Sequence, residues 1–361
     1  MTGTEAREAR VPGSISNPLR VLSFGAGAIG TYIGGSLALD GHAVTFLERP
    51  AIAAELRECG LRLKLLEREE AIPKPSLADS LEEALAHGPF DLCLFALKAY
   101  DTRAALASLV TGVGALPPIL CLQNGVENEV LIAEALGQDR VIPGTVTSAI
   151  GRNAAGDIVL ERLRGMGIAA GHPLSQRLAE ACSAAGLNAR LYTSAGSMKW
   201  SKMLTNLLAN ATSAILDMTP AEIFAHPGIY QLEVQQLREA LRVMAAQQID
   251  VVDLPGTPVR ALAFAVRSLP ARLSRPLLRN AVGSGRGGKM PSFHIDLRSG
   301  RGQTEADALN GAVVRFGERL GVATPVNRLL NRTLQSLARG EIPADSYTRN
   351  PEKLLKALRE R

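Results

Sequence analysis

The stretch RVLSFGAGAIG, residues 20–30, decides the fold of this chain. An apolar strand pattern leads into GAGAIG, which matches G-x-G-x-x-G and opens a helical segment. Such glycines permit a tight turn, let a pyrophosphate approach the backbone, and allow the helix to pack closely on the strand. The helix start supplies amide donors and the positive end of a dipole. We therefore predict a dinucleotide-binding turn, and a glycine-rich turn that binds no ligand is the alternative. The turn consists of Gly25, Ala26, Gly27, Ala28, Ile29 and Gly30.

Strand and helix patterns alternate from this turn to about residue 194. HAVTFLER at 42–49 is a second strand pattern, and two further segments, DLCLFALKA at 91–99 and PPILCLQNG at 117–125, contain continuous apolar runs. Such runs are typical of parallel strands that are buried on both faces. Helical patterns lie between them, for example TRAALASLV at 102–110 and ENEVLIAEALG at 127–137. The alternation predicts an α/β fold class, with a Rossmann-type doubly wound sheet over residues 20–194.

The pattern changes after residue 194, where strand signals vanish and long helical periodicities dominate. They cover residues 197–216, 228–249, 304–320 and 325–338. We predict an all-α C-terminal domain over residues 195–345 that shares a cleft with the first domain, interrupted by a Pro- and Arg-rich segment at 254–301. Residues 1–19 are expected to be a flexible N-terminal extension, and residues 346–361 a C-terminal tail.

Charge and composition exclude several functions. The net charge is +5, but the basic residues concentrate between Arg260 and Arg301, where eight arginines and one lysine face a single acid. The whole chain is only 4% aromatic, so this segment fits a small anionic ligand or a subunit contact better than nucleic acid. The apolar faces of the helical domain make a homodimer possible. No apolar run approaches the 18 residues of a membrane helix, and the N-terminus lacks the apolar core of a secretory signal.

The spacing of the cysteines and histidines gives no sign of a metal site or of disulfides. The four cysteines have no C-x-x-C spacing, and Cys93 and Cys121 lie in apolar runs, as reduced core residues do. The five histidines are scattered, without an H-x-x-x-H pair. We therefore expect a cytoplasmic protein that binds no metal, no nucleic acid and no membrane.

Polar residues follow the predicted strands. Glu48 and Arg49 end the second strand, where a carboxylate would hold the ribose 2′-hydroxyl of NAD and an arginine the 2′-phosphate of NADP. A solvated ion pair between the two is the alternative. Lys98 and Asn124 follow two other strands, at the carboxyl ends where ligands bind in open α/β sheets. Each could also be a helix cap or a surface residue.

The helical domain contributes a second group of polar residues. In KMLTNLLAN, residues 202–210, a helix would place Lys202, Asn206 and Asn210 on one face. Asparagines are unfavourable in helix interiors, so this face is interpreted as a ligand-binding wall rather than a solvated stripe. Further along, the basic loop GRGGKMPS at 285–292 precedes a helical segment. Glu305 lies in the first turn of a later helix, where its carboxylate could simply interact with the positive end of the helix dipole.

Taken together, these motifs resemble the ketopantoate reductase (2-dehydropantoate 2-reductase) family over about residues 20–340. The resemblance implies NADP(H)-dependent reduction of a small-molecule 2-oxo acid, in the namesake 2-dehydropantoate to (R)-pantoate in pantothenate biosynthesis. It also implies a proton-donating Lys202 and a Glu305 that contacts substrate and cofactor. The remaining roles it implies are a 2′-phosphate contact by Arg49, a place at the nicotinamide for Lys98 and Asn124, and substrate binding by Asn124, Asn206, Asn210 and Ser292.

The chain also departs from the family pattern. Pro220 and Lys289 stand where related reductases carry asparagines, and Glu48 precedes the arginine expected to bind the 2′-phosphate. These departures leave the chemistry in place and open the choice of substrate, with Lys289 and the nearby arginines suited to a more anionic acid. Two alternatives therefore stand beside 2-dehydropantoate reduction: reduction of another 2-oxo acid to a D-2-hydroxy acid, and an inactive NADP-sensing binding protein.

Overall fold

The structure is a computed structural model that describes residues 17–109, 116–270, 272–276, 278 and 289–360. Most of the predicted N-terminal extension, and residues 285–288 of the basic loop, lie outside these ranges. Leu19, at the end of the predicted extension, is fully buried. Its backbone amide donates to His42 Nδ1 at 2.9 Å, so Leu19 packs as part of the N-terminal domain.

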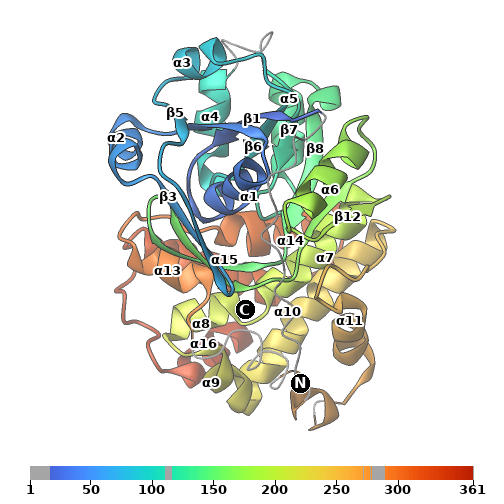
Figure 1. Ribbon diagram of the computed structural model, residues 1–361. Helices are drawn as coiled ribbons and strands as arrows, with labels where there is room; N and C mark the ends of the chain where they lie inside the picture. Colours follow the sequence, from blue (N-terminus) through green and yellow to red (C-terminus); the bar gives the residue numbers. More distant parts are fainter. Residues whose placement is uncertain (1–16, 110–115, 271, 277, 279–288, 361) are drawn as a thin grey trace, which may run out of the picture.

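An eight-stranded sheet forms the centre of the N-terminal domain, in the order β12-β11-β8-β7-β6-β1-β2-β5 (Figure 1). Its strands are β1 Arg20–Phe24, β2 Ala43–Leu47, β5 Ser76–Ala78, β6 Leu92–Phe95, β7 Ile119–Cys121, β8 Val141–Val146, β11 Met166–Ala169 and β12 Ala189–Tyr192. The predicted Rossmann-type sheet is confirmed. It is not wholly parallel, because β11 pairs with β8 in the antiparallel direction.

Helices cover both faces of this sheet. They are α1 Ala28–Leu39, α2 Pro50–Cys59, α3 Leu81–Ala86, α4 Thr102–Leu109, α5 Asn128–Leu136 and α6 Ser175–Ala184, with the short helices η1 Ala99–Asp101 and η3 Gln138–Arg140. Along β6, Leu92 and Leu94 join the core on one face, and Cys93 and Phe95 join the core on the other. Burial of alternate residues on opposite faces explains why the strand is apolar throughout.

A second sheet, which the sequence reading did not predict, packs against α1. Its order is β4-β3-β10-β9, and its strands are β3 Leu61–Leu65, β4 Arg68–Ile72, β9 Ala149–Ala154 and β10 Asp157–Arg162. In β3 the buried Leu61 and Leu63 alternate with exposed Arg62 and Lys64. This alternation of apolar and polar residues is short, so it predicts a strand less clearly than a continuous apolar run does.

The second domain is helical, as predicted. Its elements are α7 Ala195–Leu207, α8 Asn210–Leu216, α9 Pro220–Ala225, α10 Pro227–Ala246, α11 Val259–Ser268, α13 Ser292–Arg298, the π-helix η4 Asp307–Gly311, α14 Ala312–Leu320, α15 Pro325–Ala338 and α16 Pro351–Arg359. The long helix α10 contacts α7, α9, α11, α14, α15 and α16. Helix α16 occupies the expected C-terminal tail, and its Leu354 is fully buried in the helical core.

The prediction of one continuous helix over residues 197–216 is wrong. Helix α7 ends at Leu207, and Ala209 adopts a left-handed conformation with φ of 54° before α8 starts at Asn210. A buried carboxylate on α10, that of Glu233, accepts hydrogen bonds from the Ala209 amide at 2.8 Å and from the Thr212 hydroxyl at 2.6 Å. These contacts stand in for helical backbone hydrogen bonds. The break separates Asn210 from the face that carries Lys202 and Asn206.

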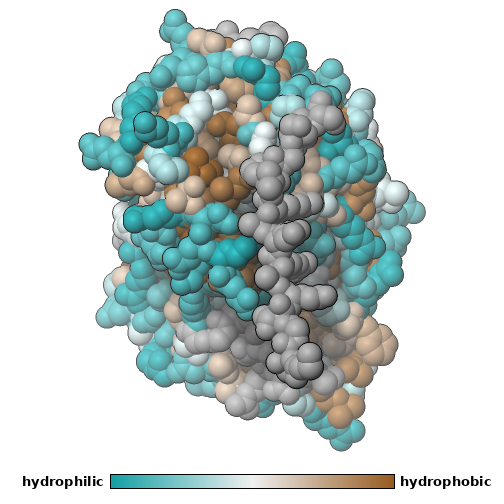
Figure 2. All heavy atoms as spheres, viewed as in Figure 1, coloured by the Kyte–Doolittle hydropathy of each residue, from teal (hydrophilic) through white to brown (hydrophobic). Residues whose placement is uncertain are grey.

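Among the described residues, no helix is long and apolar enough to cross a membrane. The face drawn in Figure 2 is mostly hydrophilic, and its hydrophobic residues gather mainly in the upper half, over the N-terminal domain.

We expect two glycines of the GAGAIG turn to respond differently to alanine. A Cβ on Gly30 would lie 2.0 Å from the Gly25 carbonyl oxygen, whereas a Cβ on Gly27 would meet nothing within 4 Å. Gly30→Ala should therefore lower the free energy of unfolding by about 1–3 kcal/mol, as overpacking does. Gly27→Ala is the matched control and should change it little. Urea unfolding measures both, and equal stability of the two variants would contradict the prediction.

Candidate active site

The glycine-rich turn, residues 25–30, joins β1 to α1 at the centre of the sheet. Gly25 has a φ of +91°, and its amide donates to the Leu47 carbonyl oxygen of β2 at 3.0 Å. Helix α1 starts without a side-chain cap, and the space next to the Cα of Gly27 is open. Uncapped amides at a helix N-terminus, beside a glycine that leaves room, fit a dinucleotide pyrophosphate.

Glu48 reaches back from the end of β2 to this turn. Its Oε1 accepts a hydrogen bond from the Ala26 amide at 2.6 Å, and its Oε2 accepts one from the Arg49 amide at 3.2 Å. Arg49 is the N-cap residue of α2, and its side chain is exposed. The solvated Glu48–Arg49 ion pair does not form, and within the described ranges the Arg49 guanidinium has no ion-pair partner.

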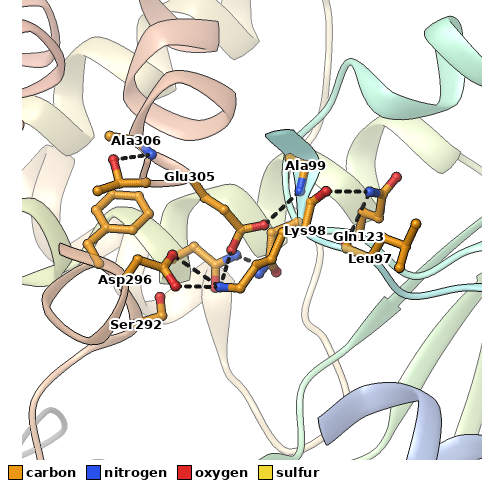
Figure 3. A network of polar contacts seen from close by, with 12 residues as sticks. Leu97, Lys98, Ala99, Gln123, Ser292, Asp296, Glu305 and Ala306 are labelled. Atoms are coloured by element: carbon orange, nitrogen blue, oxygen red, sulfur yellow. Dashed lines mark hydrogen bonds and ion pairs between the residues drawn. The ribbon is translucent and has the colours of Figure 1, made fainter. Parts of the chain in front are cut away.

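Lys98 follows β6 and bridges the two domains. Its Nζ lies 3.0 Å from Asp296 Oδ1, on α13, and 3.1 Å from Glu305 Oε2, just before η4 (Figure 3). The other Glu305 oxygen accepts from the Ala99 amide at 3.2 Å. Burial lowers the pKa of Lys98, but the two carboxylates outweigh this effect and hold that pKa above its ordinary value. The side chain is therefore a cation at neutral pH.

The pKa of the partner Asp296 is raised overall, because burial raises it by more than the Lys98 ammonium lowers it. The contact of Lys98 with two acids of the helical domain was not predicted. Nothing in the sequence near Lys98 signals it, since the partners lie about 200 residues away.

Asn124, in the loop after β7, is a second bridge between the domains. Its Oδ1 accepts a hydrogen bond from Asn206 Nδ2, on α7, at 2.9 Å. Its backbone carbonyl accepts from Asn128 Nδ2 at 2.7 Å. The next residue, Gly125, has a φ of +99°, and a Cβ there would lie 2.9 Å from the Ala308 carbonyl oxygen of η4. Only glycine lets the two domains approach so closely at this point.

The remaining predicted residues lie on α7 and at the α8–α13 contact. Lys202 is half-buried, one turn before Asn206 on α7. Asn210 donates through Nδ2 to Ser292 Oγ at 3.3 Å, and its Oδ1 accepts from the Phe293 amide at 3.0 Å. Hydrogen bonds thus join Asn124 to Asn206 and Asn210 to Ser292. Among the described residues, no hydrogen bond or ion pair links Arg49 to either pair.

A buried lysine near the site was missed by the sequence reading. Lys199, on α7, donates through Nζ to the carbonyl oxygens of Gln123 at 2.7 Å and Gly144 at 3.2 Å, and pairs with Glu129 Oε1 at 2.6 Å. Burial lowers the pKa of Lys199, but the Glu129 carboxylate outweighs this and raises it overall. The signal available was a charged residue three positions before Lys202 on an otherwise buried helical stretch.

Gln123 connects this lysine to the end of β6. Its Nε2 donates to the carbonyl oxygens of Leu97 at 3.1 Å and Lys98 at 3.2 Å (Figure 3), and to Thr102 Oγ1 at 2.8 Å. The loops after β6 and β7, which carry Lys98 and Asn124, are therefore held together by buried side chains.

Three cations of the basic segment bind away from these residues, whereas the Arg301 side chain bonds to the Tyr100 side chain, two residues after Lys98. The Lys289 ammonium forms an ion pair with Glu161 of β10, and both side chains are accessible to solvent. Arg298 pairs with Asp217 at 2.9 Å, and Arg275 Nε donates to the Phe224 carbonyl oxygen at 2.9 Å. Lys289, Arg298 and Arg275 are therefore engaged by other parts of the protein, and the suggestion of a more anionic substrate stays a prediction. Of the part of the chain that the structure describes, no cluster of His, Cys, Asp and Glu could hold a metal ion.

Comparison with known sequences identifies both domains. Residues 21–171 match the family described as ketopantoate reductase PanE/ApbA, and residues 196–338 match ketopantoate reductase PanE/ApbA C terminal. The 2-dehydropantoate 2-reductase of Halobacterium salinarum is 28% identical over 322 residues, covering 86% of this chain and 96% of that relative. The enzyme of the same name from Archaeoglobus fulgidus is 27% identical over 328 residues, covering 89% and 97%.

Comparison with solved structures agrees. A PanE/ApbA family ketopantoate reductase from Ralstonia eutropha JMP134 gives a TM-score of 0.75 at 26% identity, over 90% of this chain and 99% of the other. D-mandelate dehydrogenase in its ternary structure with NADH and anilino(oxo)acetate gives a TM-score of 0.73 at 22% identity, over 89% and 99%. The second likeness is one of fold alone.

Replacing Lys199 should destabilise the protein strongly. Lys199→Met leaves the Glu129 carboxylate and two carbonyl oxygens without their buried cation, a change that typically costs about 3–5 kcal/mol. The control is Lys356→Met, which removes an exposed lysine paired with Glu360 and should cost at most about 1 kcal/mol. Urea unfolding compares the two variants, and similar small losses would rule out a structural role for the buried pair.

Proposed function

We propose that this chain, which belongs to the ketopantoate reductase family, reduces 2-dehydropantoate to (R)-pantoate with a reduced nicotinamide dinucleotide. The observation that carries the proposal is the 2.9 Å hydrogen bond between Asn124 and Asn206. It brings the carboxyl end of β7, where open α/β sheets bind ligands, against the helix that carries Lys202. A substrate bound there would lie between a dinucleotide domain and a positioned ammonium group.

The glycine-rich turn and the uncapped start of α1 would hold the pyrophosphate of the dinucleotide. When bound, the reduced nicotinamide supplies a hydride to C2 of the 2-oxo acid. The sequence resemblance implies NADPH, and the exposed Arg49 could meet its 2′-phosphate. The contact between Glu48 and the Ala26 amide opposes that choice.

Lys202 is proposed as the proton donor. As the 2-oxo group is reduced, negative charge develops on its oxygen, and a nearby ammonium stabilises that charge. The ammonium then gives a proton to the oxygen, which completes the 2-hydroxy acid. Its half-buried place on α7, one turn from Asn206, supports this role because a partly desolvated ammonium interacts more strongly with a developing charge.

Amides and a hydroxyl would bind the rest of the substrate. Asn124, Asn206, Asn210 and Ser292 already bond to one another in pairs, so their polar groups are oriented before a ligand arrives. Amide and hydroxyl groups can donate to a carboxylate without competing for the transferred proton. Glu305, fixed by Lys98 and the Ala99 amide, would border substrate and cofactor.

A different 2-oxo acid is the second candidate. Pro220 replaces an asparagine of related reductases, and it starts α9 after the Thr219 capping box, where it is buried. A proline has no side-chain amide, so any substrate contact that the asparagine makes in related reductases would be missing here. The fold shared with D-mandelate dehydrogenase is a reason to test aromatic 2-oxo acids as well.

Lys202→Ala should lower kcat by about 10²-fold or more, because the developing alkoxide loses its proton donor. Dinucleotide affinity should change little, since the dinucleotide is held at the turn. Lys289→Ala is the control, as it removes a lysine that pairs with Glu161 on the surface. Steady-state oxidation of the reduced dinucleotide measures both variants. Full turnover by Lys202→Ala would exclude this residue as the acid.

A panel of substrates tests the reaction itself. Purified protein is assayed with NADPH and with NADH against 2-dehydropantoate and against aliphatic and aromatic 2-oxo acids. A kcat/KM of about 10⁴–10⁸ M⁻¹s⁻¹ with 2-dehydropantoate supports the namesake reaction. A faster reaction with another acid moves the proposal to that substrate. Dinucleotide binding without turnover on any 2-oxo acid would instead favour the sensing alternative.

A further inference from the structure

The end of β2 carries two opposite charges in different surroundings. Glu48 turns towards the glycine-rich turn, with its carboxylate on the Ala26 amide at 2.6 Å. A Cβ on Gly25 would lie 3.7 Å from the same carboxylate oxygen, so the carboxylate borders the turn on which a dinucleotide rests. Arg49 follows it as the N-cap residue of α2 and is exposed.

Backbone contacts fix the place of Glu48. Its own amide donates to the Ala78 carbonyl oxygen of β5 at 3.0 Å, and the Leu47 carbonyl oxygen accepts from the Gly25 amide at 3.0 Å. Its second carboxylate oxygen accepts from the Arg49 amide. Both strands and the turn therefore orient this carboxylate before any ligand binds.

We propose that Glu48 makes this chain select NADH over NADPH. A carboxylate at the end of the second strand of a Rossmann domain accepts hydrogen bonds from the ribose 2′-hydroxyl of NAD. The additional phosphate of NADP replaces that hydroxyl with negative charge and offers the carboxylate no donor. The same Glu48 that holds NADH would repel NADPH at close range.

Glu48 should repel a 2′-phosphate more strongly than Arg49 attracts it, because the two side chains differ in burial. The half-buried carboxylate is held beside the ligand, where water and salt screen it less. The exposed guanidinium must be ordered to reach a 2′-phosphate, and exposed ion pairs contribute little to affinity. Repulsion by the fixed charge should therefore outweigh attraction by the exposed one.

The inference rests on the proposed binding of a nicotinamide dinucleotide, but its test needs no 2-oxo acid. NADH and NADPH are each titrated into the purified full chain, with nicotinamide fluorescence as the readout. The wild type should bind NADH at least about tenfold more tightly than NADPH. Glu48→Gln keeps the size of the side chain and removes its charge. It should therefore lower the ratio of the NADPH dissociation constant to the NADH dissociation constant by about tenfold or more.

Glu69→Gln is the matched control, because it removes an exposed glutamate of β4 that pairs with Lys64. It should leave the ratio of the two dissociation constants as in the wild type. Tighter binding of NADPH by the wild type, or an unchanged ratio in a folded Glu48→Gln variant, would overturn the proposal. Circular dichroism checks the folding of that variant. If the 2-oxo acid assignment fails, turnover is lost in the panel while the selectivity of binding remains.

Discussion

The placement of the helical domain on the Rossmann sheet depends on the buried ammonium of Lys199. Three oxygens surround it, from the carbonyls of Gln123 and Gly144 and the carboxylate of Glu129. A buried cation requires such partners, because its desolvation is costly without them. Helix α7 is thereby attached to the loop after β7, to β8 and to α5. Together with the Asn124–Asn206 hydrogen bond, this contact positions α7, and with it Lys202, relative to the sheet.

Most of the fold could be predicted from the sequence, because the signals are local. The GAGAIG turn and the continuous apolar runs specify strands buried on both faces, and β1, β6 and β7 form where those runs lie. Long helical periodicities likewise identify the second domain. The second sheet was missed because strands such as β3 are short and half exposed, and because β3 and β10 pair across about a hundred residues.

Sequence position and family resemblance single out the candidate site residues but do not predict their contacts. Lys98, Asn124 and Glu305 stand out by position and by family resemblance, yet their partners come from distant parts of the chain. The break after α7 was also unpredictable from local sequence, since it depends on a distant residue. The carboxylate of Glu233, on α10, accepts the hydrogen bond of the Ala209 amide in place of a helical backbone carbonyl. Glu48 is the reverse case: the sequence around it fits both dinucleotides, and its contact with the Ala26 amide is the observation that supports the proposed preference for NADH.

The ion pairs of Lys98 have a consequence for how a substrate arrives. Its ammonium is paired with the carboxylates of Asp296 and Glu305, so these three groups together carry one negative formal charge. They therefore do not attract a carboxylate ligand over a long range. Positive charge that can attract such a ligand lies on Lys202 and on Arg301, whose side chain bonds to the Tyr100 side chain. A carboxylate that enters the site would be drawn towards these cations rather than towards Lys98.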